Sequence, residues 1–291
     1  MKGLVKMAFT EKNAAGISGY DVSKVEQYVR IIQDDIVPKD GAARSSYARM
    51  LSMDATIYGL VCVLQYKEMF RQAVNAESPD YAGFNRFVHD RELAKPGYKA
   101  FKSPNVDTIY SNAWLNLNDG PVLVEIPEFG ERYYTLQFLD MYGNASNISL
   151  RTRGSEAGKY LIATTDWEGE VPPGYIRYNV STPYQWILMR IYPLDEADLS
   201  EVHALQDAVK IIPLPSGENV RAKNIEYPAA GQGGAVEFFA ILDFVLRTNG
   251  IPHEEEALVY RYRAIGIGGR EPFRFDRLDS ETREGIMDGY N

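Results

Sequence analysis

The period of the apolar residues changes twice along this chain, and this change constrains the fold more than any other feature. Between about residues 22 and 87, apolar residues recur every three or four positions, as on the buried face of a helix. Between about 107 and 193 the period falls to two, which is typical of strands. From residue 198 the helical period returns. The sequence therefore predicts an α+β chain with a helical N-terminal segment, an antiparallel β-sandwich-like middle and a helical C-terminal segment.

The predicted strands of the middle region follow one another without an intervening helix. Glycine and proline residues at 120–121, 129–130 and 172–174 mark the turns between them. Strands joined in this way pair antiparallel, so we expect a sandwich or a partial barrel. The strands are predicted over residues 122–126, 132–139, 159–163 and 185–192. We divide the chain into a helical N-terminal region (1–100), an antiparallel β domain (101–195) and a helical C-terminal region (196–291).

Two helices are expected in the N-terminal region. The first follows Asp21 as its N-cap and is closed by Pro38 and Gly41. The second runs from Ser52 or Asp54 to residue 74, and its apolar residues on most sides predict burial. Further helices are predicted over residues 199–212, 236–248, 253–265 and 280–287.

Charge and composition exclude several classes of protein. The net charge of −9 and the lack of a Lys/Arg run argue against a nucleic-acid partner, which would need a basic surface. No apolar run approaches the roughly 20 residues of a membrane span, and the N-terminus lacks a signal-peptide core. The single cysteine, Cys62, cannot form an internal disulfide and is expected to be a buried structural thiol. A cytoplasmic protein is therefore expected.

Hydrogen-bonding side chains without charge are concentrated between residues 101 and 145. They are Asn105, Thr108, Tyr110, Ser111, Asn112, Tyr142 and Asn144, with Asp107 and Asp140 among them. Such groups either tie a fold together from inside or line a polar pocket, and the sequence leaves both possibilities open. On a strand, Tyr110 and Asn112 face one side while Ser111 faces the other, so not all of them can line one pocket.

A series of short motifs in this chain resembles the family known as domain of unknown function 1254. The motifs lie at residues 85–89, 104–114, 121–122, 132–134, 139–144 and 151–154, and the resemblance covers about residues 50–265. It implies a helical segment followed by β-sandwich domains, and esterase-like activity on phenolic esters has been attributed to relatives. The chain departs from relatives at residues 164–167 and at Met189, where larger side chains would reshape a nearby pocket.

The resemblance also implies a further β domain, because relatives usually continue into one of the 1214 family. This chain stops at Asn291, near the linker that should precede that domain. We therefore expect a second chain that supplies the β domain, or a homo-oligomer.

Candidate catalytic groups are few. There is no Gly-x-Ser-x-Gly elbow, and Cys62 has no histidine partner in view. Of the three histidines, His203 and His253 are expected on helix surfaces, whereas His89 falls within a family motif. His89 is thus a candidate site residue, with a hydrogen-bonded core histidine as the alternative. No histidine pair has metal-ligand spacing, and a calcium site built from Asp107, Asp140 and Asn side chains would match no known ligand spacing, so no metal is expected. No redox cofactor is expected either.

Arginines and aromatic residues complete the set of candidates. Arg151, Arg153 and Arg190 could hold a carboxylate through two hydrogen bonds each, or could be solvated at strand ends. Tyr133 and Tyr134 point to opposite faces of a strand, so one should be buried. The tryptophans Trp114, Trp167 and Trp186 are expected to serve packing rather than ligand stacking.

The predicted function is a small-molecule enzyme that uses acid–base chemistry on an aromatic or carboxylated compound. Ester hydrolysis is the reaction class that the resemblance implies. The predicted catalytic residues are His89, Asp107 and Tyr110, with His89 and Asp107 transferring protons. The predicted substrate-binding residues are Asn105, Ser111, Tyr134, Tyr142, Asn144 and Arg151. The alternatives are a partner-dependent small-molecule-binding subunit and a biosynthetic lyase or isomerase.

Overall fold

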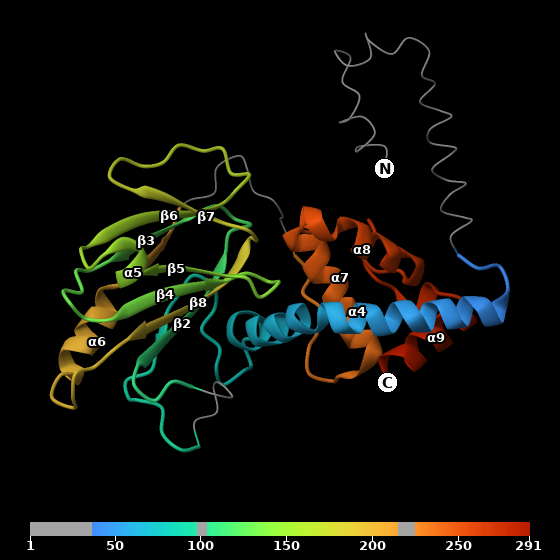
Figure 1. The fold of residues 1–291 in the computed structure, drawn as a ribbon, viewed down its shortest axis with the longest axis horizontal. Coiled ribbons are helices and arrows are strands. Elements are labelled where there is room, and N and C mark those ends of the chain that lie inside the picture. Colours follow the sequence, from blue (N-terminus) through green and yellow to red (C-terminus); the bar gives the residue numbers. More distant parts are fainter. Residues whose placement is uncertain (1–36, 98–103, 215–224) are drawn as a thin grey trace, which may run out of the picture.

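A computed structural model describes residues 37–97, 104–214 and 225–291 (Figure 1). A β-sandwich forms one half of the molecule and a group of helices forms the other, and the long helix α4 extends from the helical half toward the sandwich. The predicted α+β architecture, with helical ends and a β-rich middle, is confirmed. The helix predicted after Asp21 lies outside the described residues.

Helix α4 (Gly41–Met69) is longer than the sequence predicts, and a π-helical turn, η1 (Phe70–Val74), continues it. The side chain of Asp40 caps its N-terminus by accepting a hydrogen bond from the backbone N–H of Ala43 at 2.9 Å. The prediction that this helix begins at Ser52 or Asp54 is therefore wrong. Gly41 is the first residue of α4, because Asp40 satisfies one of the N–H groups that a helix start leaves unpaired.

The middle region forms two sheets. The five-stranded sheet, which we call sheet A, has the order β1 (Val88–His89), β2 (Ile109–Asn116), β8 (Tyr184–Ile191), β4 (Tyr134–Leu139) and β5 (Ala145–Ser149). The four-stranded sheet B has the order β7 (Ile176–Val180), β6 (Gly158–Thr164), β3 (Val122–Ile126) and β9 (Lys210–Pro213). Every paired strand is antiparallel except β6 and β7, which run parallel.

Strand β9 corrects the expected helix over residues 199–212. Helix α6 (Leu199–Ala208) ends early, and the chain then adds β9 to the edge of sheet B next to β3. Val202 of α6 is buried with the apolar residues between the two sheets, so this helix covers one end of the sandwich core. The short helix α5 (Leu150–Arg153) follows β5.

The helical half has its own apolar core. It contains α4, α7 (Gly234–Asn249), α8 (Glu256–Arg261) and α9 (Ser280–Tyr290), with short 3-10 turns η2 (His253–Glu255), η3 (Tyr262–Ile265) and η4 (Phe275–Arg277) between them. Trp114 of β2 and Tyr184 of β8 belong to this core, so the outer face of sheet A packs partly against the helices. Cys62 is buried there, as predicted.

One side of α4 carries an exposed apolar stripe, contrary to the prediction that the helix is buried on most sides. Its residues are Met50, Met53, Ile57, Leu60, Val61 and Leu64. Ile57 in the middle of the stripe is 74% exposed. The stretch Gly41–Val74 is also long and apolar enough to cross a membrane, a test that core helices of soluble proteins pass as well. The exposed apolar stripe distinguishes α4 from the core helix of a soluble protein, in which such residues would be buried.

Candidate functional site

The outer face of sheet A, on the side of α4, carries aromatic and polar side chains where its two central strands pair. Alternate residues of β2 and β8 point to this face. They oppose one another directly across the strands, as Tyr110 with Arg190, Asn112 with Leu188 and Trp114 with Trp186. Trp186, Asn112 and Arg190 are half-buried, whereas the other three are buried. This face is the candidate functional site.

Indole and amide groups form one chain of hydrogen bonds on this face. Trp186 donates its Nε1–H to the side-chain oxygen of Asn112, whose amide nitrogen donates to Oε1 of Gln72 in η1, the turn that continues α4. Trp114 donates its Nε1–H to the same oxygen of Gln72 at 3.0 Å. An indole can only donate, so the two indoles fix which way both amides point.

The chain of hydrogen bonds continues into α4, which supplies its anchor. Gln72 donates its amide to Oε1 of Glu68 at 2.6 Å. The rings of Trp114 and Trp186 lie 5.2 Å apart at an angle of 10°, a stacked pair across neighbouring strands. Side chains held in this way by both hydrogen bonds and stacking present a rigid surface to a ligand.

Arg190 lies beside this network, with neutral neighbours. Its Nη1 donates to Oε1 of Gln137 on β4 at 2.8 Å, and its guanidinium lies 5.4 Å from the centre of the Tyr110 ring. Its Nε is buried and makes no hydrogen bond within the described residues. Among those residues it also forms no ion pair, so its charge has no carboxylate partner there. Unpaired buried cations are rare in proteins.

The predicted catalytic residue His89 is held by Ser111 on the opposite face of sheet A. The two residues pair directly across β1 and β2, and His89 Nδ1 lies 2.7 Å from Ser111 Oγ. Gln206 of α6 donates its amide to the same hydroxyl at 2.9 Å. Burial lowers the pKa of His89, and the charge of Arg91 lowers it further, so the imidazole is neutral at pH 7.

Ser111 is only 1% exposed, and Gln206 covers it. Oγ accepts from the amide of Gln206 and keeps its own proton free to donate to Nδ1, in the tautomer of the neutral imidazole that carries its proton on Nε2. The pair therefore has the hydrogen-bond pattern of a serine and a base, but the hydroxyl lies inside the sandwich rather than at a surface.

Asn105 and Asp107 lie just before β2, at an exposed turn. The backbone N–H of Asn105 donates to the hydroxyl of Tyr110 at 2.8 Å, which joins two of the predicted site residues. Asp107 lines a hollow of about 460 Å³ with Leu93, Tyr192 and others. Within the described residues no hydrogen bond or ion pair joins Asp107 to His89, so the predicted proton-transfer pair is not assembled.

Tyr142 and Asn144 lie in the turn between β4 and β5, which Asp140 organises. Oδ1 of Asp140 accepts the backbone N–H groups of Tyr142 and Asn144, both at 2.9 Å. Its Oδ2 accepts from the amide of Asn144 at 3.1 Å and from the hydroxyl of Ser181 at 2.6 Å. Tyr142 donates its hydroxyl to the carbonyl of Gly250 in the helical half. These contacts tie the hairpin to the rest of the fold.

Tyr134 and Arg151 lie apart from the other predicted residues. Tyr134 is fully buried between the sheets and donates its hydroxyl to the carbonyl of Gly154 at 2.8 Å, while burial raises its pKa to about 12. Its neighbour Tyr133 is exposed, as the strand period predicts. Arg151 is exposed on α5. The predicted substrate-binding set is therefore divided among four places: the turn before β2, the interior of the sandwich, the turn between β4 and β5, and α5.

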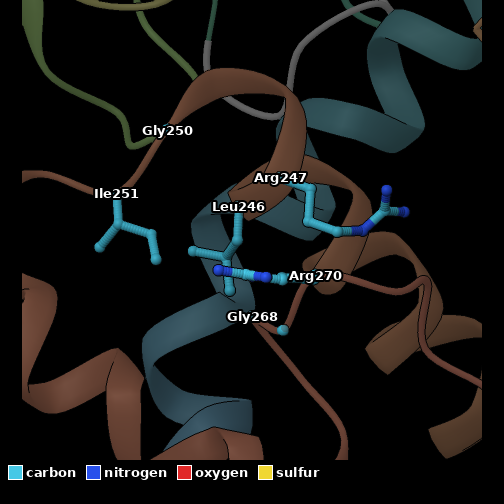
Figure 2. A pocket seen from close by; sticks show the side chains of 7 residues that line it. Leu246, Arg247, Gly250, Ile251, Gly268 and Arg270 are labelled. Carbon is cyan, nitrogen blue, oxygen red and sulfur yellow. The ribbon is translucent and has the colours of Figure 1, made fainter. Parts of the chain in front are cut away.

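A second hollow, of about 390 Å³, lies in the helical half at the C-terminal end of α7 (Figure 2). It is lined by Leu246, Arg247, Gly250, Ile251 and the segment 268–270. Figure 2 shows Arg247 pointing away from Arg270, and Arg247 donates to buried Asp243 at 2.8 Å. None of the site residues predicted from the sequence lines this hollow. Arg247, which does line it, already has Asp243 as its carboxylate partner.

The described part of the chain contains no group of three or more His, Cys, Asp or Glu side chains that could hold a metal ion. The residues of this face that sequence reasoning missed are Gln72, Gln137 and Trp186, the last of which the sequence predicts only to pack. The alternation along β8 signals that Trp186 and Arg190 share a face, but nothing local links Gln72 to Asn112.

The fold and this polar face define a β-sandwich protein with helical flanks and a candidate site on one sheet. The model of the family described as Protein of unknown function (DUF1254) matches residues 84–213, which confirms the resemblance over this part of the chain. The match spans β1 to β9, which is the whole sandwich.

A solved structure with a similar fold is that of the VPA0106 protein from Vibrio parahaemolyticus. The TM-score is 0.63 and the identity 24%, over 83% of this chain and 57% of that one. The chain therefore spans little more than half of the length of that protein, and the likeness concerns the fold alone. No curated protein matches this chain.

Proposed function

We propose that this protein binds a small organic molecule with an aromatic or apolar body on the outer face of sheet A. The observation that carries the proposal is the indole–amide chain of Trp186, Asn112, Gln72 and Trp114. A sheet face that only packed against helices would be expected to be apolar. Here Asn112 and Trp186 are half-buried, and the hydrogen bonds among Trp186, Asn112 and Gln72 hold these side chains in one orientation. Fixed polar side chains of this kind suit a preorganised binding surface.

The proposed chemistry is acid–base catalysis without a redox cofactor, with ester hydrolysis as the reaction class. His89 would supply the base, because its neutral imidazole can accept a proton at pH 7. A lyase or isomerase would use the same group. Since His89 and Ser111 belong to the inner face of sheet A, the geometry supports binding on the outer face more strongly than this catalytic step.

Quenching of tryptophan fluorescence by a panel of aromatic esters, acids and amides tests the binding proposal. We expect at least one compound to quench saturably, and Asn112→Leu to weaken its binding at least tenfold, because Trp186 and Gln72 both lose their partner. The matched control is Trp167→Phe, on the loop after β6, which should leave the affinity unchanged. Absence of saturable quenching, or unchanged binding by folded Asn112→Leu, would refute the proposal.

A second candidate function, that of a subunit which works in an oligomer, is favoured by the exposed stripe of α4. Five of its residues follow one another in steps of three, four, three and four positions, from Met50 to Leu64. This is the spacing of a seam between two helices. A stripe on one helix can meet its own copy across a two-fold axis, so we propose a homo-oligomer joined through α4.

Light scattering after size exclusion, with native mass spectrometry, tests the oligomer. We expect an oligomer for the unmodified chain and a monomer for Ile57→Glu, because a charge in the seam is costly to bury. Thr165→Glu, which adds the same charge at an exposed position in the loop after β6, is the control. A monomer that binds ligand fully, or a complex with a different chain, would contradict this proposal.

A further inference from the structure

We infer that the ligand of the outer face of sheet A is an organic acid, and that Arg190 holds its carboxylate through Nε and Nη2. This inference rests on the proposed binding function of that face. Three features of Arg190 support it: the fixed orientation of its guanidinium, the unused edge of that group, and the absence of a counter-charge among the described residues.

The orientation of the guanidinium is fixed from two sides. Gln137 accepts a hydrogen bond from Nη1 at 2.8 Å, and the ring of Tyr110 lies 5.4 Å below the guanidinium carbon. Tyr110 is held in turn by the backbone N–H of Asn105, which donates to its hydroxyl. Gln137 is thus a positioning residue for Arg190. An arginine held in this way loses little conformational freedom when it binds a ligand.

The remaining edge of the guanidinium has the shape that a carboxylate requires. Nε–H and the neighbouring N–H of Nη2 point in parallel, and their spacing matches the two oxygens of a carboxylate. Nε is buried without a partner, and Nη2 makes no hydrogen bond to any described residue. A buried donor that lacks a partner is destabilising by itself, and such groups in folded proteins call for a functional explanation.

The charge balance of the site points to an anion. Arg190 is half-buried in the middle of sheet A, and its contacts are to the neutral residues Gln137 and Tyr110. Two other half-buried arginines of the described chain have carboxylate partners: Arg132 pairs with Asp198, and Arg71 pairs with Glu68. A carboxylate supplied by the ligand would give Arg190 the partner that the fold gives the others.

The positions along β8 set the shape of the acid. Leu188 and Trp186 follow Arg190 on the same face, at steps of about 7 Å for every second residue of a strand. A carboxylate at Arg190 therefore places an attached aromatic or apolar body over Leu188 and toward Trp186. The geometry fits an aryl carboxylate or aryl alkanoate better than a small inorganic anion, because only the larger ligand can reach the half-buried Trp186 from Arg190.

A matched pair of ligands tests the inference: 1-naphthylacetate and its neutral amide, 1-naphthylacetamide, titrated by calorimetry. We expect the unmodified protein to bind the acid at least tenfold more tightly than the amide. Arg190→Gln should abolish this preference by weakening the binding of the acid far more than that of the amide, and Arg190→Lys should keep it only in part, because lysine lacks the paired donors.

The matched control is Arg177→Gln, since Arg177, on β7 of sheet B, is also half-buried and lies over an aromatic ring, that of Trp167 in the loop after β6. It should keep the full preference for the acid. Equal binding of acid and amide, with both lost in Asn112→Leu, would overturn this inference while the proposed function stands. Binding of neither ligand would overturn both, and tighter binding of inorganic phosphate than of the naphthyl acid would replace the carboxylate by a phosphate.

Discussion

At the scale of single residues, the polar motifs of this chain serve two different purposes. Asp140 accepts four hydrogen bonds within its own hairpin and from Ser181, so it maintains the fold. Tyr134 likewise uses its hydroxyl inside the sandwich. Asn112 and Arg190, by contrast, are half-buried on the outer face of sheet A. Sequence alone does not separate the two groups, because the same amide or hydroxyl suits a buried turn and a ligand equally well.

The role of His89 can be tested by substitution. If it is the base of the proposed reaction, His89→Ala should lower the turnover of an accepted ester by about 100-fold or more, the usual contribution of a positioned base. His253→Ala is the control, because that side chain is 90% exposed. Steady-state kinetics decide the matter: turnover of folded His89→Ala within about threefold of the unmodified protein would leave His89 a structural residue.

At the scale of helices and strands, the period of the sequence predicts which elements form but not where they end. Strand β3 lies where the pattern predicts it, because its alternation is bounded by proline and glycine. The start of α4 was misjudged, since the cap by Asp40 outweighs the proline and glycine nearby. Strand β9 was missed because its four residues gain their stability from pairing with β3, which is distant in sequence.

The packing of α9 against α4 depends on small residues. A Cβ added at Gly285 would lie 2.2 Å from the carbonyl oxygen of Ser45 and 2.7 Å from the Cβ of Ala48. The side chain of Ser52 also donates to the carbonyl of Ile286 at 2.8 Å, which holds the two helices close. Only glycine at position 285 permits α9 and α4 to lie this close together. The sequence alone does not reveal that Gly285 lies at such a contact.

Gly285→Ala should therefore destabilise the protein although alanine favours helix. We expect a loss of about 1–3 kcal/mol in the free energy of unfolding, the usual effect of an overpacked core position. Gly41→Ala is a matched control, because its Cβ would meet only the flexible side chain of Glu281 at 3.4 Å. Urea unfolding of both variants provides the measurement, and equal stability would show that the two helices are not packed this closely.

The ion pair of Arg132 and Asp198 links the segment before β4 to the start of α6. Both side chains are nearly buried, at 8% and 9% exposure, and the hydrogen bond from Arg132 lowers the pKa of Asp198. A carboxyl group whose pKa is lowered by folding contributes stability above its ordinary pKa of 3.8, and this contribution is lost as the pH falls toward the lowered value.

Asp198→Asn should for that reason be less stable than the unmodified protein at pH 7. The gap between the two should shrink as the pH falls below about 3.8, because the unmodified protein then loses the charged form of Asp198. Glu168→Ala, an exposed change in the loop after β6, should show no such pH dependence. A gap that stays constant down to pH 2.5 in thermal unfolding experiments would contradict the assigned pKa shift.

At the scale of the whole molecule, the candidate site exists because the helical half meets the sandwich. Gln72 in η1 orients Asn112, which follows it by 40 residues, and Gln137 orients Arg190 from a neighbouring strand. The α+β class and the individual strand faces could be predicted from local periods. The site itself could not, since it depends on contacts between segments far apart in the sequence.

The central claim is that the outer face of sheet A binds an organic acid, and a crystal structure with a bound aryl carboxylate tests it most directly. We predict that the carboxylate lies within hydrogen-bond distance of Arg190 Nε and Nη2, with the aromatic body over Leu188 and Trp186. A ligand found instead in the hollow between Arg247 and Arg270, or in that beside Asp107, with the outer face of sheet A unliganded, would contradict the claim.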